Sequence, residues 1–97
     1  QSAFTSAGQR CTAARRLVVV DSMYEKIVPA VKALSERLIV GEPFADPQPF
    51  MGPVIDNHTA DLLAASFVEL MSRGGRPLMH MRRPDESLPF LTPAILD

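Results

Sequence analysis

The sequence predicts an α/β fold in which helices pack against strands in layers. Two segments repeat apolar residues with the period of an amphipathic helix, and three short apolar runs are typical of strands. Their order along the chain is strand, helix, loop, helix and strand, which is typical of a layered α/β unit. The length of 97 residues and the hydrophobic fraction of 46% bound the chain to one folded domain at most.

The first predicted strand and the first predicted helix follow one another directly. Leu17 to Val20 is a continuous apolar run, as expected of a strand buried on both faces. A helix is expected to begin at Ser22, because Ser22 and Glu25 have the spacing of a capping box. Pro29 predicts a bend or a late start, and Gly41 is the expected stop. The residues expected to pack on the sheet are Ile27, Val31, Leu34 and Leu38.

The second predicted helix follows a proline-rich segment, residues 42 to 53, which predicts an extended loop. Asp56 or Asn57 is expected to cap this helix, because short polar side chains accept from free N–H groups there. Gly74 and Gly75 are expected to end it. Its predicted apolar face consists of Leu63, Phe67, Leu70 and Met71.

Two further strands are predicted near the end of the chain, over residues 77 to 81 and 90 to 96. The polar segment between them, residues 82 to 86, predicts a turn. Pro93 lies inside the last run and lacks an N–H group, which indicates an edge or a bulge at that point.

The composition excludes several classes of function. The formal charge is −1, from 10 basic and 11 acidic side chains, so we expect neither nucleic acid nor a membrane as partner. No apolar run approaches the roughly 20 residues that cross a bilayer, and no signal peptide is visible. The single cysteine excludes an internal disulfide and is typical of a reducing compartment, so we expect a cytoplasmic location.

The segment from Phe4 to Thr12 carries the strongest functional signal, because it contains the only cysteine, Cys11. Residues 1 to 9 are expected to complete a helix, and Gly8 with Gln9 can shape a turn. A thiol attacks as the thiolate, which a turn opening onto a helix N-terminus favours through free N–H groups and the dipole. The same N–H groups can stabilise an oxyanion. The segment therefore predicts covalent catalysis.

A structural role for Cys11 is the alternative, because free cysteine is often buried as a small apolar residue. The polar neighbours Gln9 and Arg10 favour a site over a buried thiol. Arg15 and Arg16 could add positive potential near the sulfur, but a solvated basic face is the preferred interpretation of both.

No second catalytic or ligand-binding cluster is predicted. His58 and His80 are the only histidines, and no local pattern places either one beside Cys11. One cysteine and two scattered histidines do not indicate a metal site. The cofactor-binding residues are unknown, because the sequence has neither a Gly-x-Gly-x-x-Gly fingerprint nor a phosphate loop.

Phe4, Gly8-Gln9 and Cys11 fit the pattern Phe-x-x-x-Gly-Gln-x-Cys, so the chain resembles the NAD(P)-dependent aldehyde dehydrogenases. Three further segments resemble family landmarks in the same order, and together they cover nearly the whole chain: Arg16 to Val20, Gly52 to Ile55, and Leu91 to Leu96. The resemblance implies that residues 1–97 are part of the catalytic, nucleophile-bearing domain. It also implies that the cofactor-binding and oligomerisation domains are absent, and that the chain is a piece of a longer enzyme.

Within the family, the chain most resembles the branch that oxidises N-succinylglutamate 5-semialdehyde in arginine breakdown. The residues that carry this closer resemblance are 1–4, 7–12, 14–17 and 49–52. The alternative is the branch that oxidises pyrroline-5-carboxylate, or glutamate semialdehyde. That branch shares the Ser-Ala-Gly-Gln-Arg-Cys character and the run from Gly52 to Asp56.

The resemblance implies the chemistry of the site. The Cys11 thiolate would attack the aldehyde carbon to form a thiohemiacetal, hydride would pass to NAD or NADP, and water would release the acid from the thioester. The Cys11 backbone N–H would provide half of the oxyanion hole. Phe4, Arg10 and Thr12 would contact the substrate, and the turn at Gly8 and Gln9 would support them.

The expected partners are a small-molecule aldehyde and further copies of the chain in a homo-oligomer. The 97 residues alone are expected to bind no cofactor and to turn over no aldehyde, because the family's general-base glutamate and its oxyanion asparagine have no counterpart here. Two alternatives of other classes remain: a binding module with a redox-sensitive Cys11, and a structural α/β domain with an inert thiol.

Overall fold

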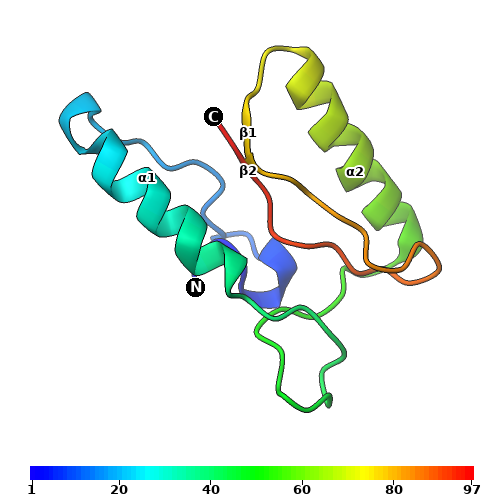
Figure 1. The fold of residues 1–97 in the computed structure, drawn as a ribbon. Helices are drawn as coiled ribbons and strands as arrows, with labels where there is room; N and C mark the ends of the chain where they lie inside the picture. The colour runs from blue at the N-terminus through cyan, green and yellow to red at the C-terminus, as the bar shows by residue number, and fades with distance from the viewer.

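The computed structural model describes residues 1–97 and confirms the α/β class (Figure 1). A 3₁₀ turn, η1 (Thr5–Gly8), precedes helix α1 (Asp21–Glu36) and helix α2 (Asn57–Ser72). Strands β1 (Pro77–Met79) and β2 (Ile95–Leu96) complete the fold and run between the two helices in Figure 1. The sheet is therefore small, and loops carry much of the chain.

Strands β1 and β2 pair antiparallel, with Pro77 opposite Leu96 and Met79 opposite Ile95. The register is irregular between Pro77 and Met79, so the ladder is short. The strands predicted over 77–81 and 90–96 are present but shorter than expected. Pro93 has no N–H to donate and lies before β2, where the regular ladder has not yet begun.

The strand predicted over Leu17 to Val20 is absent. The segment belongs to no helix or strand, and it exposes 62% of Leu17, 93% of Val18 and 66% of Val20. A strand needs a neighbour to pair its N–H and C=O groups, and no other segment forms a strand ladder with this one. The expectation that both faces are buried was wrong for the same reason.

Helix α1 is present, but its ends differ from those predicted. It begins at Asp21 after Val20, which provides no side-chain cap, and Ser22 lies inside the helix, so the capping box was a wrong prediction. Pro29 is accommodated within α1 without a late start. The helix ends at Glu36, and Gly41 lies in the loop beyond it.

Helix α2 begins and ends as the sequence predicts. The Asp56 carboxylate accepts the Thr59 N–H at 2.7 Å, and this hydrogen bond lowers the pKa of Asp56 below its usual range. Gly74 has a φ of 102°, which ends the helix, and the Gly75 N–H donates to the Leu70 carbonyl at 2.9 Å. Local chemistry therefore fixes both ends of this helix.

The core is small and lies where α2 begins. Val54, Ala60 and Leu91 form a buried cluster, and the half-buried Ala7 and Met81 pack against it. Of the apolar faces predicted for the two helices, Phe67 is buried and the residues Leu34, Leu63 and Leu70 are exposed. Since Ala7 belongs to the segment that carries Cys11, the core anchors that segment.

A polar cluster joins α1 to the C-terminal end of the sheet. The Tyr24 hydroxyl donates to the Asp97 carboxylate at 2.6 Å, and the Arg76 guanidinium donates to the same carboxylate at 2.6 Å. The Tyr24 hydrogen bond and then Arg76 lower the pKa of Asp97, and the bond to Asp97 raises the pKa of Tyr24. The contact orients α1 against the sheet.

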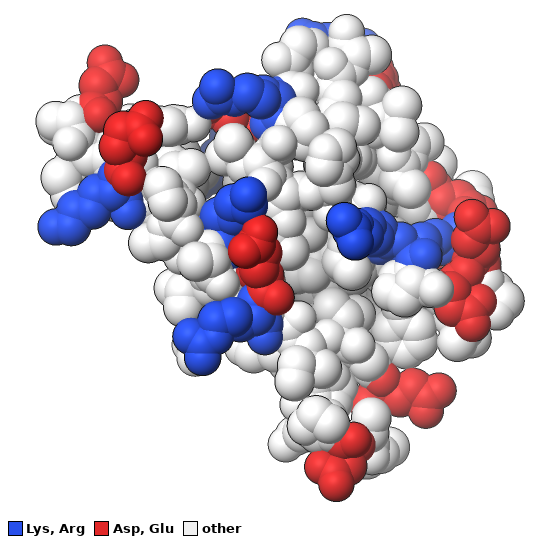
Figure 2. Space-filling view, in the orientation of Figure 1, with Lys and Arg blue, Asp and Glu red and all other residues white.

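Acidic and basic side chains lie next to one another at several places on the molecular face of Figure 2, and uncharged groups cover much of the rest. No large area of one sign appears on this face. None of the helices has both the length and the apolar character needed to span a membrane.

The two helix starts predict different responses to loss of a polar side chain. Asp56→Ala removes the hydrogen bond to the Thr59 N–H and should lower the free energy of unfolding. Ser22→Ala should leave it nearly unchanged, because Ser22 lies inside α1 and caps nothing. Urea unfolding of both variants measures the difference. Equal losses would contradict the assignment of the caps.

Candidate active site

The backbone before Cys11 forms a tight turn instead of the helix expected over residues 1 to 9. Only η1 is helical, and within it Ser6 and Ala7 have positive φ values of 56° and 54°. Gly8 follows with a φ of 71°. A short segment cannot offset the cost of nucleating an α-helix, so local hydrogen bonds set its shape. The result is a compact left-handed turn that leads into the cysteine segment.

Gln9 ties this turn to the loop that precedes α2. Its side-chain nitrogen donates to the Ser6 carbonyl at 3.0 Å and to the Pro53 carbonyl at 3.3 Å. Its side-chain oxygen accepts the Ile55 N–H at 2.8 Å. Two segments that match family landmarks, the cysteine turn and the Gly52 to Ile55 loop, are therefore joined through one amide.

Cys11 lies in a turn that is open to solvent. The Ala13 N–H donates to the Arg10 carbonyl at 3.1 Å, and the Ala14 N–H closes the loop by donating to the Ser2 carbonyl at 3.3 Å. Cys11 is a free, exposed cysteine, so it is not buried as a small apolar residue. The expected helix N-terminus at Cys11 is also absent, because the next helix begins at Asp21.

Backbone donors near the thiol are free despite the missing helix. The N–H groups of Arg10, Cys11 and Thr12 have no hydrogen-bond partner within the protein. Donors of this kind can stabilise negative charge on a substrate oxygen when they converge on it. The turn therefore offers the type of group that the helix N-terminus was expected to supply.

The other predicted site residues share the segment but make no hydrogen bond to Cys11. Phe4 is half-buried, and Arg10 and Thr12 are exposed. Arg10 makes no ion pair, whereas Arg73, Arg76 and Arg83 are each paired with a carboxylate: the partners are Glu69, Asp97 and Asp61. Phe4, Arg10 and Thr12 are therefore neighbours of Cys11 in the sequence, but no hydrogen bond links them to it. Within this segment, Gln9 is the residue whose side chain bonds to a distant part of the chain.

Arginine and histidine residues outside this segment lie as the sequence suggests. Arg15 and Arg16 are exposed, in keeping with a solvated basic face. His58 is exposed on the first turn of α2, and His80 follows β1 with its ring 6.1 Å from that of Phe67. Neither histidine hydrogen-bonds to Cys11. The structure also contains no group of three potential metal ligands.

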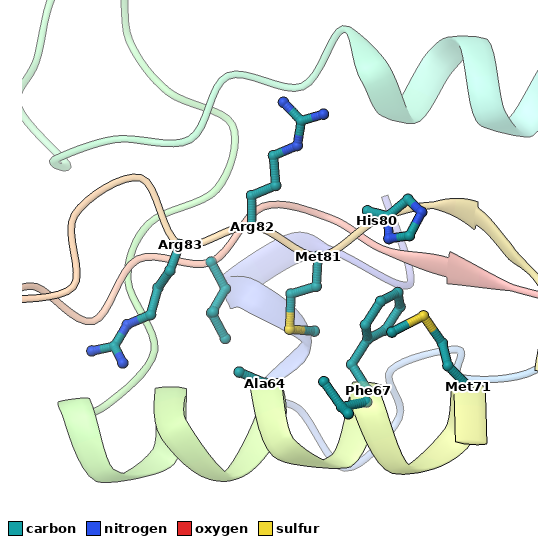
Figure 3. Close-up of a pocket in the computed structure, with 9 residues that line it drawn as sticks. Ala64, Phe67, Met71, His80, Met81, Arg82 and Arg83 are labelled. Carbon is teal, nitrogen blue, oxygen red and sulfur yellow. The ribbon is translucent and has the colours of Figure 1, made fainter. Parts of the chain in front are cut away.

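A small hollow lies between α2 and the segment after β1, away from Cys11 (Figure 3). It encloses about 170 Å³, and Phe67 and Met71 from α2 face Met81 and His80 across it. A larger open hollow of about 470 Å³ lies between α1 and β1, lined by Tyr24, among others. Cys11 lines neither hollow, and neither is bordered by a glycine-rich phosphate loop.

The sequence did not reveal the partners of Gln9. The contact to Pro53 spans 44 positions and the contact to Ile55 spans 46, and neither residue carries a polar side chain that would signal the pairing. The contacts of Arg83 with Asp61, Asn57 and Glu86 were missed in the same way, since residues 82 to 86 were predicted only as a polar turn.

Comparisons with known proteins identify the family. Residues 1–97 match the family model described as the aldehyde dehydrogenase family. The chain is 65% identical over 97 residues to an N-succinylglutamate 5-semialdehyde dehydrogenase of Novosphingobium aromaticivorans, covering all of this chain and 21% of that protein. This chain belongs to the aldehyde dehydrogenase family, and it spans about a fifth of the length of the curated relatives it matches.

Two solved structures have the same fold over nearly the whole chain. HpcC from Thermus thermophilus matches with a TM-score of 0.86 and 24% identity, covering 98% of this chain and 20% of that one. The NADP-dependent glyceraldehyde-3-phosphate dehydrogenase from Bacillus halodurans, solved with NADP, matches with a TM-score of 0.78 and 31% identity. The match covers 98% of this chain and 19% of that one. The first likeness concerns the fold alone.

The turn before Cys11 should depend on Gly8. An added Cβ would lie 3.0 Å from the Ala3 carbonyl oxygen, and φ is positive, so Gly8→Ala should cost about 1 kcal/mol or more. Gly52→Ala is the matched control, because no atom lies within 4 Å of its added Cβ and its φ is not positive. Urea unfolding compares the two, and equal costs would contradict the left-handed turn.

Proposed function

We propose that residues 1–97 are the nucleophile-bearing part of an aldehyde dehydrogenase that oxidises N-succinylglutamate 5-semialdehyde to N-succinylglutamate. One observation carries the proposal. Cys11 is exposed on a turn that Gln9 holds by hydrogen bonds, in a chain that is 65% identical to a dehydrogenase named for that substrate. The cofactor-binding and oligomerisation domains would lie outside these residues.

Cys11 would act as the covalent nucleophile. Its sulfur would form a bond to the aldehyde carbon, and the carbonyl electron pair would move to the oxygen. The Cys11 N–H, which has no partner in the protein, would stabilise that oxygen together with a donor from elsewhere in the enzyme. NAD, or alternatively NADP, would supply the hydride acceptor from a site that these 97 residues do not form. Phe4 and Thr12 would line the aldehyde pocket, and Gly8 would shape the turn.

The surroundings of the site would come from the rest of the enzyme. The 97 residues alone would turn over no aldehyde, because they provide neither a general base beside Cys11 nor a cofactor site. The exposed run from Leu17 to Val20 supports assembly with further protein, and we propose a homo-oligomer of the complete subunit. The single cysteine supports a reducing, cytoplasmic setting.

Removing the thiol tests the proposed function. In the complete protein, Cys11→Ala should abolish NAD(P)-dependent oxidation of N-succinylglutamate semialdehyde, lowering kcat by at least about a thousandfold. His58→Ala should keep the activity, because that imidazole is exposed and has no contact with the cysteine turn. Steady-state kinetics measure both variants.

Other outcomes would point to other functions. Faster oxidation of glutamate semialdehyde would favour the pyrroline-5-carboxylate branch. No oxidation of either semialdehyde, with a Cys11 that is readily and reversibly oxidised, would support a redox-sensitive binding module. If neither semialdehyde is oxidised and Cys11 is alkylated slowly, the chain would be a structural α/β domain with an inert thiol.

Arg10 would select substrates that carry a carboxylate. It is exposed and has no ion-pair partner, so its guanidinium is available for a charge-assisted contact with an acidic substrate. Arg10→Met should raise KM for acidic semialdehydes by about tenfold, with a smaller rise for neutral aldehydes. Arg15→Met is the control, because that side chain bonds only to the Ala13 carbonyl at 3.4 Å. An equal rise for both substrate types would remove this role.

A further inference from the structure

Arg83 is the least exposed of the charged residues. Only 15% of its side chain is exposed, and its Nε is buried with no hydrogen-bond partner. The desolvation of a cation and of an N–H group is unfavourable unless other contacts offset it. The contacts of the guanidinium therefore have to account for its position.

The guanidinium joins the start of α2 to the turn that contains Glu86. It pairs with the Asp61 carboxylate, and it donates to the Asn57 side-chain oxygen and to the Glu86 carbonyl, each at 2.9 Å. Asn57 in turn donates to the Ser87 carbonyl at 3.0 Å. The planar guanidinium carries five N–H donors in a fixed arrangement, so one arginine can hold these three acceptors without rearranging.

The same turn supports the loop that Gln9 contacts. The Val54 N–H donates to the Pro89 carbonyl at 2.9 Å, and Leu91 packs against Val54 in the buried cluster. The peptide groups on either side of Val54 are the ones that Gln9 contacts, at the Pro53 carbonyl and the Ile55 N–H. The loop is thus held from one side by the Arg83 turn and from the other side by Gln9.

We infer that Arg83 is a positioning residue for Cys11, acting through the Val54 loop and Gln9. The inference rests on the proposed role of Cys11 as nucleophile. Loss of the Arg83 contacts would let the loop shift, and the turn that Gln9 attaches to it would shift with it. Small displacements of a reacting group lower the rate of the chemical step far more than they weaken binding.

The test uses the complete protein and counts active sites by titration of Cys11. Arg83→Gln should lower kcat per titrated site by about tenfold, with KM for NAD(P) changed by less than about twofold. Arg73→Gln is the matched control, because Arg73 also pairs with a carboxylate on α2 but lies at the far end of that helix. It should leave both constants unchanged. A purely structural role would reduce the number of titratable sites and leave kcat per site intact, which would overturn the inference.

A double-mutant cycle identifies the route. After Gln9→Ala, the further change Arg83→Gln should cost little, because both substitutions release the same loop. Independent, multiplying effects would overturn the proposed route. If Arg83→Gln does not fold, Asn57→Ala replaces it, since it removes one Arg83 acceptor and keeps the Asp61 pair.

A second measurement tests the role of Arg83 even if the protein is not a dehydrogenase. If the unmodified protein oxidises neither semialdehyde, the dehydrogenase proposal fails, and the rate of Cys11 alkylation by iodoacetamide replaces kcat. Arg83→Gln and Gln9→Ala should then change that rate in the same direction by about threefold or more. An unchanged rate in Arg83→Gln would overturn the positioning role independently of the enzymatic reaction.

Discussion

The side-chain amide of Gln9 is the contact on which the geometry of the candidate site depends. An amide both donates and accepts, so one side chain can satisfy the Pro53 carbonyl and the Ile55 N–H on either side of Val54. A carboxylate could keep only the second contact, and an ammonium only the first. A glutamine suits this position because its side chain must donate to one peptide group and accept from the next.

This contact matters because the core beneath it is small. Val54, Ala60 and Leu91 form the buried cluster, and Ala7 is the residue by which the cysteine segment joins it. A short chain buries too little apolar surface to position a mobile turn by packing alone. Directional hydrogen bonds therefore set where Cys11 lies, while the apolar cluster supplies the common base for the turn and the loop.

Local chemistry was predictable from the sequence, and contacts between distant segments were not. Asp56 and Gly74 fix the ends of α2 through groups within one helical turn, so their roles could be predicted. The strand over Leu17 to Val20 and the helix start at Ser22 were predicted wrongly, because the first needs a partner strand and the second competes with an earlier start. A turn at Gly8 and Gln9 was expected, but the positive φ values of Ser6 and Ala7 replaced an expected helix, and the partners of Gln9 lie more than forty positions away.

Amide hydrogen exchange of Ile55 in Gln9→Ala tests the central claim most directly. In the unmodified protein, the Ile55 N–H donates to the Gln9 side chain and the Val54 N–H donates to the Pro89 carbonyl. Our account predicts that Gln9→Ala speeds exchange at Ile55 by about tenfold or more, with a smaller change at Val54. Unchanged protection of Ile55 would mean that Gln9 does not hold the loop, and it would contradict the account.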